Sequence, residues 1–494
     1  MDADRPKDPP HSVPPSDSKH FDPENLIKTV IAVPLLKDIE GDPAALRYVI
    51  IDINLRHEEG REKAKSEIFQ FIVDAIQAAG DPNVQQGAHR SKSESSRQYV
   101  YARLQGKVIR ELVARDQRNK TRAIFHVWPD FIVRAQIWKS VPTVKADACR
   151  RSFATTGKGI LWAILDSGID AAHPHFAQFG NLKNLPGPVT HMDFTTDPPA
   201  KVDAPVDNYG HGTHVAGIIA GQLEETQASA PVAIVRERDA IGAITYQVQK
   251  NLGTAISIAP ECKLVSFKVL DQSGQGPVSN VIAAIETIQE INGFGRDVII
   301  HGVNLSVGYD FEAEWFACGQ SPVCVEVDRL VKSGVCVVIA AGNTGRGFEL
   351  TINDPGNAEL AITVGSTHRD MPHVYGVSYF SSKGPTGDGR RKPDLLAPGE
   401  RIVSCGAGPD LDTFKNKAGL DGQPGAYYIE RSGTSMAAPH VSGIVAGLLS
   451  VRSEFIGRPQ DIKKLLVENA TDLGRDTAFQ GRGLVDMMRA IQAI

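Results

Sequence analysis

Apolar and polar residues follow two different periodicities along the chain. In residues 48–55 the apolar side chains alternate as in a strand, and in residues 62–79 they recur at helical spacing. A second strand is predicted at residues 123–128, and the polar stretch 81–96 is typical of a loop. We therefore expect residues 25–138 to form a small α+β domain.

From residue 139 onward the pattern becomes strand, helix, strand, repeatedly. Apolar runs predict buried strands at residues 161–165, 264–270, 297–307, 335–341 and 361–364. Helices are predicted between them at residues 278–288 and 325–332, and after them at residues 434–449. This order indicates an α/β domain over residues 139–494, with a doubly wound, mainly parallel sheet and helices on both faces.

Residues 1–24 differ from both domains. They are rich in Pro, Ser and charged side chains, so they bury too little apolar surface to offset their ordering entropy, and we expect a disordered tail. They lack the apolar segment of a secretory signal, and no apolar run approaches the ~18 residues that cross a bilayer. These observations favour a cytoplasmic protein that does not contact membranes.

Composition narrows the possible functions. The chain has 494 residues, and 41% of them are hydrophobic, which is enough for two or more domains with a large core. The net charge is -5 and the pI is about 6.3, with charges of both signs interspersed along the chain. No basic region indicates a nucleic-acid partner.

The cysteines do not form a disulfide framework, because six in a chain of this length are too few. Cys318 and Cys324 lie close in sequence. Their loop can close as a disulfide in an oxidising compartment or keep two thiols in a reducing one. No set of Cys and His residues has the spacing of a zinc site.

Three short motifs contain the residue types of nucleophilic catalysis. Asp166 opens Asp-Ser-Gly, His211 opens His-Gly-Thr-His, and Ser435 lies in Gly-Thr-Ser-Met-Ala. A serine hydroxyl is a poor nucleophile at neutral pH, so it needs an imidazole to take its proton and a carboxylate to orient that imidazole. Two neighbouring residues could compete for these roles, but each has a simpler structural interpretation. We expect His214 to be a buried hydrogen-bonding partner of its helix and Asp170 to brace its loop.

The three motifs, in the order Asp, His, Ser, resemble those of subtilisin-like serine peptidases, the subtilase family, over about residues 141–494. The resemblance implies that Ser435 is the nucleophile, His211 the general base and Asp166 its orienting carboxylate. Asn343, in Ala-Ala-Gly-Asn-Thr-Gly, matches the oxyanion-hole asparagine of the family, with the Ser435 N–H as second donor. The implied activity is endopeptidase hydrolysis through an acyl-enzyme.

Two further segments resemble the strands that flank the substrate in this family. Peptides are commonly held extended by adding a strand to exposed backbone edges. The implied substrate-binding residues are Gly274, Gln275 and Gly276 in one segment and Ser306, Val307 and Gly308 in the other. Asp354 lies in a sequence resembling the loop that closes the primary specificity pocket, where it would favour a basic side chain.

One departure from the family concerns metals. Residues 222–257 form a long insertion where many subtilases carry a short calcium-binding loop. This insertion has few carboxylates, whereas Ca²⁺ takes six to eight oxygen ligands. Asp203 and Asp207, near His211, are expected to be solvated in a loop. We predict no required metal and no cofactor.

The N-terminal α+β domain has two interpretations. It resembles in position and in element order the propeptide of subtilases, an intramolecular inhibitor and folding chaperone, which would be cleaved near residues 133–142. Alternatively, it is a retained domain that keeps the site shut until a partner binds, so that the chain acts as a regulated protease or binding protein. The propeptide interpretation is favoured. A propeptide and a disulfide between Cys318 and Cys324 would both be typical of an exported protein, so export stays open as an alternative to the cytoplasm. A third function, transpeptidation, would need a peptide amine to intercept the acyl-enzyme.

Overall fold

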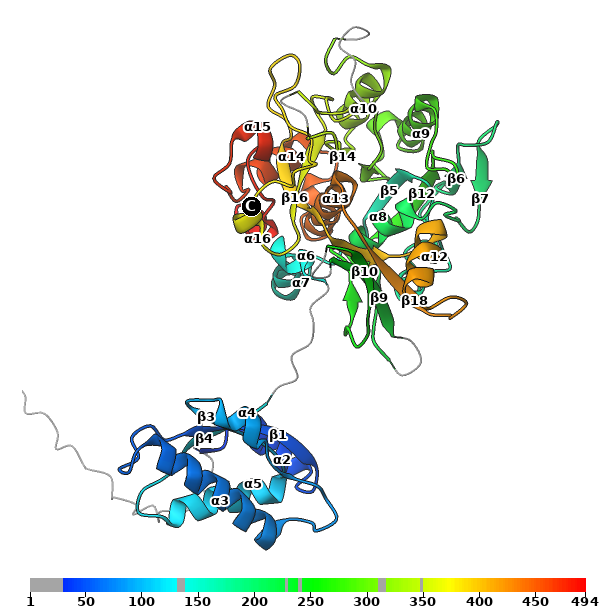
Figure 1. Cartoon of the computed structure of the whole chain (residues 1–494). Coiled ribbons are helices and arrows are strands. Elements are labelled where there is room, and N and C mark those ends of the chain that lie inside the picture. Colours follow the sequence, from blue (N-terminus) through cyan, green and yellow to red (C-terminus); the bar gives the residue numbers. More distant parts are fainter. Residues whose placement is uncertain (1–29, 131–137, 227–229, 239–241, 310–316, 347–349) are drawn as a thin grey trace, which may run out of the picture. The chain divides into compact units, whose positions relative to one another are not determined.

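The computed structural model describes residues 30–130, 138–226, 230–238, 242–309, 317–346 and 350–494. The chain forms two compact units, residues 1–133 and 134–494 (Figure 1). The predicted tail over residues 1–24 and much of the predicted cleavage region lie outside the described residues.

The N-terminal unit is an α+β domain with one four-stranded antiparallel sheet in the order β2-β3-β1-β4. The two predicted strands are β1 (Leu46–Ile53) and β4 (Ile124–Pro129), and the predicted helix is α3 (Arg61–Ala79). Helix α2 (Val33–Gly41) precedes them. Helices α2, α3 and α5 (Gly106–Arg118) bury one face of the sheet in a shared apolar core.

Three elements of this unit escaped prediction, namely α2, β3 (Tyr99–Gln105) and α5. The predicted loop at residues 81–96 was also partly wrong, because it contains β2 (Gly87–Ala88) and α4 (Arg90–Glu94). A signal for β3 was present, since Val100, Ala102 and Leu104 alternate and are all buried. Tyr101 and Arg103 lie between them and obscure this signal.

The C-terminal unit is built on an eight-stranded sheet in the order β16-β15-β14-β13-β5-β12-β6-β7. All pairs in it are parallel except β6 with β7. The strands are β5 (Leu161–Asp166), β6 (His191–Asp193), β7 (Ala200–Val202), β12 (Lys263–Lys268), β13 (Gly302–Leu305), β14 (Cys336–Ala340), β15 (Ile362–His368) and β16 (Leu395–Glu400). The predicted mainly parallel α/β fold is confirmed.

Helices cover both faces of this sheet, as the continuous apolar strands predict. Along β5, Trp162 and Ile164 enter one core, whereas Leu161, Ala163 and Leu165 enter the other. The first core also contains α8 (His211–Ile219) and α13 (Thr434–Val451), and the second contains α9 (Val278–Ile291) and α10 (Pro322–Lys332). Helix α10 ends where Gly334 takes φ 97°, a conformation that glycine adopts without strain.

Shorter helices complete this unit. They are α6 (Ser140–Thr143), α7 (Ala146–Phe153), α11 (Pro372–Tyr375), α12 (Gly408–Lys417), α14 (Pro459–Glu468), α15 (Thr477–Gln480) and α16 (Met487–Gln492). Among the described residues, α13 alone has the length and composition of a membrane span. It is 83% buried inside the unit, as expected for the central helix of a core.

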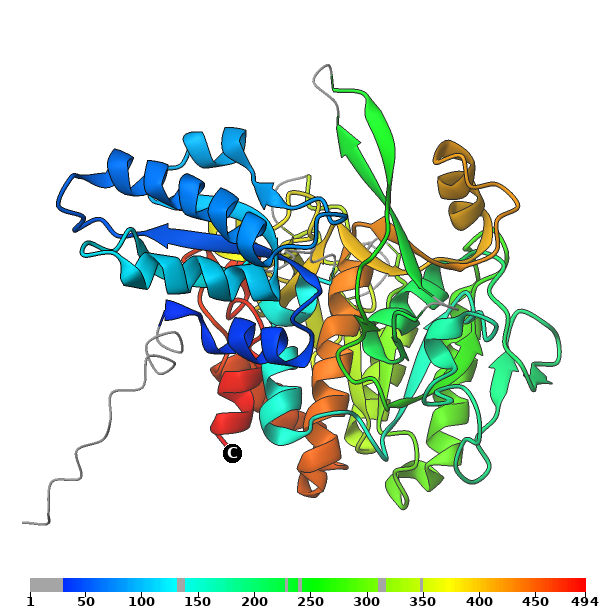
Figure 2. The same ribbon diagram turned by 90° about the horizontal axis from the view of Figure 1, so that it is seen from below.

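The predicted insertion forms β-structure. It contains β8 (Gln222–Leu223), β9 (Pro231–Arg238), β10 (Ile244–Gln249) and β11 (Ala255–Ile256). Strands β9 and β10 pair as a hairpin, and β9 also pairs in parallel with β18 (Ala426–Arg431), which in turn pairs with β17 (Ile402–Cys405). Figure 2 shows the hairpin, in green, projecting from the body of this unit. Because β18 leads directly to α13, the hairpin is anchored beside the Ser435 motif.

Candidate active site

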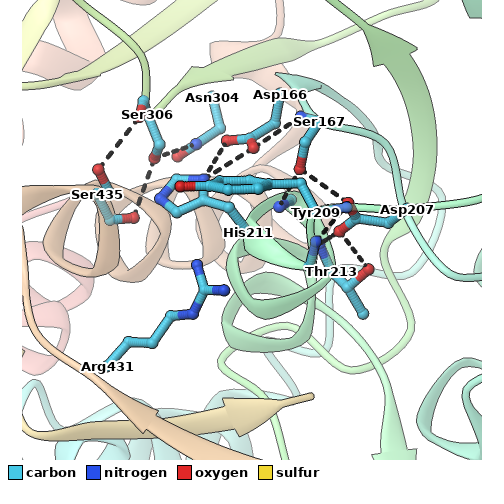
Figure 3. Close-up of polar contacts among 12 residues, drawn as sticks. Asp166, Ser167, Asp207, Tyr209, His211, Thr213, Asn304, Ser306, Arg431 and Ser435 are labelled. Carbon is cyan, nitrogen blue, oxygen red and sulfur yellow. Dashed lines mark hydrogen bonds and ion pairs between the residues drawn. The ribbon is translucent and has the colours of Figure 1, made fainter. Parts of the chain in front are cut away.

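Three elements of the C-terminal unit bring the predicted triad residues together. Asp166 ends β5, His211 begins α8, and Ser435 lies in the first turn of α13. His211 Nδ1 is 2.8 Å from Asp166 Oδ1 and 3.0 Å from Oδ2 (Figure 3). The Asp166 side chain is fully buried, whereas His211 and Ser435 are half-buried and line one cleft of about 600 Å³.

Two glycines allow α8 to approach Asp166 this closely. Gly168 has φ 112°, and a Cβ there would lie 2.1 Å from the Val206 carbonyl oxygen. A Cβ at Gly212 would lie 2.1 Å from the Gly168 carbonyl oxygen and 3.1 Å from the Asp166 Cβ. The glycines of the Asp-Ser-Gly and His-Gly-Thr-His motifs are therefore required by close backbone packing at the site.

The Ser435 hydroxyl is held on the main chain beside the end of β13. It donates to the Ser306 carbonyl at 3.1 Å, and the Ser306 hydroxyl donates to the Ser435 carbonyl at 3.0 Å. Ser306 Oγ also accepts from Asn304 Nδ2 at 2.9 Å, and Asn304 Oδ1 accepts from Ser442 Oγ at 2.9 Å. This buried chain of hydrogen bonds fixes the first turn of α13.

Asn343 lies beside the same helix end. Its Oδ1 accepts from the Thr434 N–H at 2.9 Å and from Thr434 Oγ1 at 3.1 Å. Because the oxygen of the amide is engaged there, its Nδ2 donor is left for the cleft, which Asn343 lines together with Ser435. The Ser435 N–H belongs to the first turn of α13, where helical N–H groups lack an acceptor within the helix. Two donors can thus stabilise negative charge at one point of the cleft.

A buried carboxylate supports the loop before His211. Asp207 Oδ1 accepts from Ser167 Oγ at 2.9 Å and from the Gly210 N–H at 2.7 Å. Its Oδ2 accepts from the N–H and the hydroxyl of Thr213, at 2.8 and 2.7 Å. The expectation that Asp207 is solvated was therefore wrong, because donors two to six positions away fold back over it and Ser167 reaches it from the end of β5. Asp203 is exposed as expected.

The remaining histidine and aspartate of these motifs have structural partners. His214 is fully buried and its Nε2 lies 3.0 Å from the Ile429 carbonyl oxygen, and burial holds its pKa well below the usual range. The Asp170 carboxylate accepts from the Ala172 N–H at 3.0 Å, so it braces its own loop.

All six implied substrate-binding residues line the cleft with His211 and Ser435. They are Gly274, Gln275, Gly276, Ser306, Val307 and Gly308. Asp354 differs, because its side chain is fully buried and its Oδ1 accepts from Asn357 Nδ2 at 2.9 Å. Its neighbour Asn353 lines the cleft instead. The structure therefore contradicts the expectation that Asp354 selects a basic substrate side chain from within the cleft.

Sequence analysis missed two residues near the catalytic pair. Tyr209, in the loop before α8, has its ring centroid 6.5 Å from that of His211. The guanidinium of Arg431, at the end of β18, lies 6.0 Å from the Tyr209 ring and forms an ion pair with Asp410 at 2.6 Å. Arg431 approaches Tyr209 only because β18 folds beside the loop before α8. The sequence around Ser435 does not predict this contact.

The insertion does not resemble a calcium site. Glu224 Oε1 accepts from Gln178 and Gln222 side chains, and Glu225 Oε2 accepts from the Gly253 N–H at 2.6 Å. Within the described ranges there is no group of three or more His, Cys, Asp or Glu side chains placed to hold a metal ion. Glu224 and Glu225 are thus engaged by donors of the protein itself.

Comparisons with known proteins agree with the fold and the motifs. Residues 157–484 match the profile of the subtilase family. Serine protease AprX of Bacillus subtilis is 31% identical over 340 residues, covering 67% of this chain and 65% of AprX. Subtilisin E of Bacillus subtilis is 29% identical over 396 residues, covering 79% of this chain and 80% of the relative.

Pyrolysin of Pyrococcus furiosus is a partial match, 32% identical over 321 residues, which cover 58% of this chain and 21% of pyrolysin. The chain thus spans less than two thirds of AprX and of pyrolysin, although it spans most of subtilisin E. The family match extends from before Asp166 to beyond Ser435 and includes the whole cleft. The chain therefore belongs to the subtilase family, the subtilisin-like serine peptidases.

Proposed function

We propose that the protein is a serine endopeptidase that cleaves protein substrates through an acyl-enzyme. The observation that carries this proposal is the His211 imidazole, bound on one side to buried Asp166 and opening on the other to the cleft that Ser435 and Asn343 share. A neutral imidazole whose Nδ1–H is held by a carboxylate presents its Nε2 lone pair as a base.

The residues divide the reaction as follows. Ser435 Oγ attacks the peptide carbonyl carbon while His211 takes the hydroxyl proton, and Asp166 stabilises the resulting imidazolium. The Asn343 amide and the Ser435 N–H donate to the carbonyl oxygen as it gains negative charge. His211 then protonates the leaving amine and the C–N bond breaks. Water, deprotonated by His211, releases the acyl group and regenerates Ser435.

Ser435→Ala tests this assignment. The substitution removes one oxygen, so we expect the fold to persist and casein hydrolysis to fall to background. Ser453→Ala is a matched control, because Ser453 is exposed and lies beyond the end of α13. Casein turnover by Ser435→Ala equal to that of the control would refute the proposal.

We further propose that the N-terminal unit is an intramolecular inhibitor. Its helices cover one face of its sheet, while the other face carries exposed aromatic side chains, such as Tyr48 (50% exposed) and Trp128 (44% exposed). A half-covered sheet favours burial of the open face against another surface. The peptidase unit, joined to it by the chain, is the partner that we propose.

Intact-mass analysis separates this role from that of a permanently retained domain. The wild-type protein should lose a fragment that ends near residues 133–142, whereas Ser435→Ala should keep its full mass. The separated fragment, added back, should slow hydrolysis by the mature enzyme. A wild-type protein that stays full length and hydrolyses casein freely would contradict both cleavage and inhibition.

We propose a reducing compartment, the cytoplasm, for the folded protein. All six cysteines are free thiols in the structure, and of the close pair Cys324 is buried while Cys318 is half-buried. Burial raises the pKa of both thiols, which makes them less reactive toward oxidation. Thiol alkylation of protein taken directly from cells should find both cysteines reduced, and an oxidised pair would contradict the proposal.

A further inference from the structure

A second cavity, of about 910 Å³, adjoins the catalytic cleft. The end of β9, the start of β10, the turn between β16 and β17 and the residues just after β18 form its walls, and Asn343 lines both this cavity and the cleft. We call it the leaving-side cavity. It is of the size that binds peptide side chains or small ligands.

The position of Asn343 indicates which part of a substrate reaches this cavity. Asn343 and Ser435 mark the reacting carbonyl, and the two segments 274–276 and 306–308 line the catalytic cleft but not the leaving-side cavity. We infer that an extended peptide bound along those segments, with its carbonyl at Asn343, continues past Asn343 on the side of its leaving amine. The residues that follow the cleaved bond therefore enter the leaving-side cavity.

We propose that this cavity selects acidic side chains on the leaving side of the substrate, and that Arg236, Arg238 and Arg346 supply the positive charge. This proposal rests on the proposed peptidase function and adds a substrate class to it. Arg236 and Arg238 lie two positions apart on β9, so their side chains share one face of the hairpin. Arg346 reaches the cavity from the loop that follows Asn343.

The three arginines contact neutral groups. Arg236 donates to the Glu430 main-chain carbonyl at 3.4 Å and lies 5.5 Å above the Phe414 ring. Arg238 donates to the Gly242 carbonyl at 3.3 Å, and Arg346 donates to the Tyr379 hydroxyl at 3.4 Å. Over the described ranges none of the three pairs with a carboxylate, so each keeps its charge and spare N–H donors.

Three glutamates line the cavity together with four arginines, so they offset only part of the positive charge. The Glu430 carboxylate is buried and lies 3.2 Å from Arg401 Nε and 3.6 Å from an Arg369 nitrogen. Glu400 accepts from Ser378 Oγ at 3.1 Å. Glu237, between the two β9 arginines, also lines the cavity. With Glu430 paired to Arg401, the lining still holds Arg236, Arg238 and Arg346 against Glu237 and Glu400, and so keeps a net positive charge for a ligand.

The arginines are also positioned before a substrate binds. Residues Arg236 and Arg238 pair with Tyr246 and Ile244 of β10, and an Arg401 nitrogen donates to the Arg236 carbonyl at 2.8 Å. A guanidinium group whose backbone and ring contacts already fix it loses little freedom when it binds a carboxylate. Because β9 belongs to residues 222–257, the insertion would supply two of the three arginines that give this selectivity.

Peptide hydrolysis measures the selectivity directly. Internally quenched peptides with one common acyl side would carry Glu, Gln or Lys at the second and third positions after the cleaved bond. We expect kcat/KM for the Glu peptide to exceed that for the Lys peptide by about tenfold or more at low salt. The ratio should shrink as salt rises to about 0.5 M, because salt screens exposed charges.

The triple variant R236Q/R238Q/R346Q assigns the preference to these side chains. Its Glu-to-Lys ratio should fall to within about twofold, whereas Arg296→Gln, at an exposed position beyond α9, should keep the wild-type ratio. Each ratio is internal to one protein, so a loss of folded enzyme cancels. A wild-type ratio near one, or an unchanged ratio in the triple variant, would overturn the proposal.

Binding separates failure of this proposal from failure of the peptidase function. If the wild type hydrolyses none of the peptides, the peptidase function fails first. Calorimetry with Ser435→Ala and the same peptides then tests the cavity by itself. Tighter binding of the Glu peptide than of the Lys peptide supports it, and equal affinity overturns it.

Discussion

Asp207→Asn is the sharpest test of how the site is supported. Asp207 is 6% exposed and its two carboxylate oxygens accept from the loop before His211 and from the first turn of α8. Asparagine keeps the shape but replaces one acceptor oxygen with an NH₂ group. That group would face the N–H or the hydroxyl of Thr213, both of which are donors to Oδ2. The variant therefore loses hydrogen bonds without creating space.

The expected cost follows from those contacts. Hydrogen bonds to a charged group contribute about 1.5–3 kcal/mol each, and an unpaired buried donor adds its own desolvation cost. Loss of the two Thr213 contacts, together with the charge near the N-terminus of α8, should cost roughly 3–4 kcal/mol. With about 2.1 cal/mol/K of unfolding entropy per residue, the melting temperature of the unit over residues 134–494 should fall by about 4–5 °C.

The matched control for this change is Asp203→Asn, in the same loop but exposed. Both changes would be made in the Ser435→Ala background, so that self-digestion does not intervene. Thermal unfolding gives the shift, and hydrogen exchange should show faster exchange at Gly210 and Thr213 in the Asp207 variant only. Equal melting temperatures for the two variants, within about 1 °C, would refute the structural role of Asp207.

Three further outcomes are expected. Asn343→Ala should lower kcat by about 10²–10³ with little change in KM, measured by steady-state hydrolysis, and an unchanged kcat would remove Asn343 from the oxyanion site. Burial raises the pKa of Asp116 to about 6. The N-terminal unit should therefore lose up to about 3 kcal/mol of stability as pH rises from about 4 to 6. Hydrogen exchange measures this loss, and Asp116→Asn should abolish it. Ser306→Ala breaks the hydrogen bond to the Ser435 carbonyl and should reduce kcat several-fold without changing the rank order of substrates; a wild-type kcat would show that this bond does not position Ser435.

The pH effect at Asp116 has a definite sign. The folded state holds the proton to a higher pH than the unfolded state, whose aspartate titrates near 3.8. The stabilisation is therefore complete at acidic pH and is lost as pH passes the folded pKa. Ala123 and Ile124 donate N–H groups to Asp116, and the Asn variant keeps an acceptor for them.

The main sheet could be predicted because its strands are buried on both faces. Runs such as Leu161–Asp166 contain no exposed position, so their apolar character is continuous in the sequence. Strand β3 could not be found by the same criterion, because its outer positions carry Tyr99, Tyr101 and Arg103. A sheet with one open face gives only alternate apolar residues, and this weaker signal was overlooked.

The site could be predicted as far as its chemistry lies in short motifs. The motifs that contain Asp166, His211 and Ser435 are local, whereas the burial of Asp207 depends on donors that fold back over it. The leaving-side cavity could not be predicted, because it joins Arg236 to Arg346 across more than a hundred residues. Charge in a sequence indicates neither burial nor neighbours, and the tertiary fold decides both.

The central claim is that Asp166, His211 and Ser435 act as one chemical unit. Covalent labelling with a fluorophosphonate, followed by peptide mapping, tests it most directly. We predict one adduct, on Ser435, that forms rapidly in the folded enzyme, slowly in His211→Ala and not at all after denaturation. A label on another residue, or equal labelling rates in the wild type and His211→Ala, would contradict the claim.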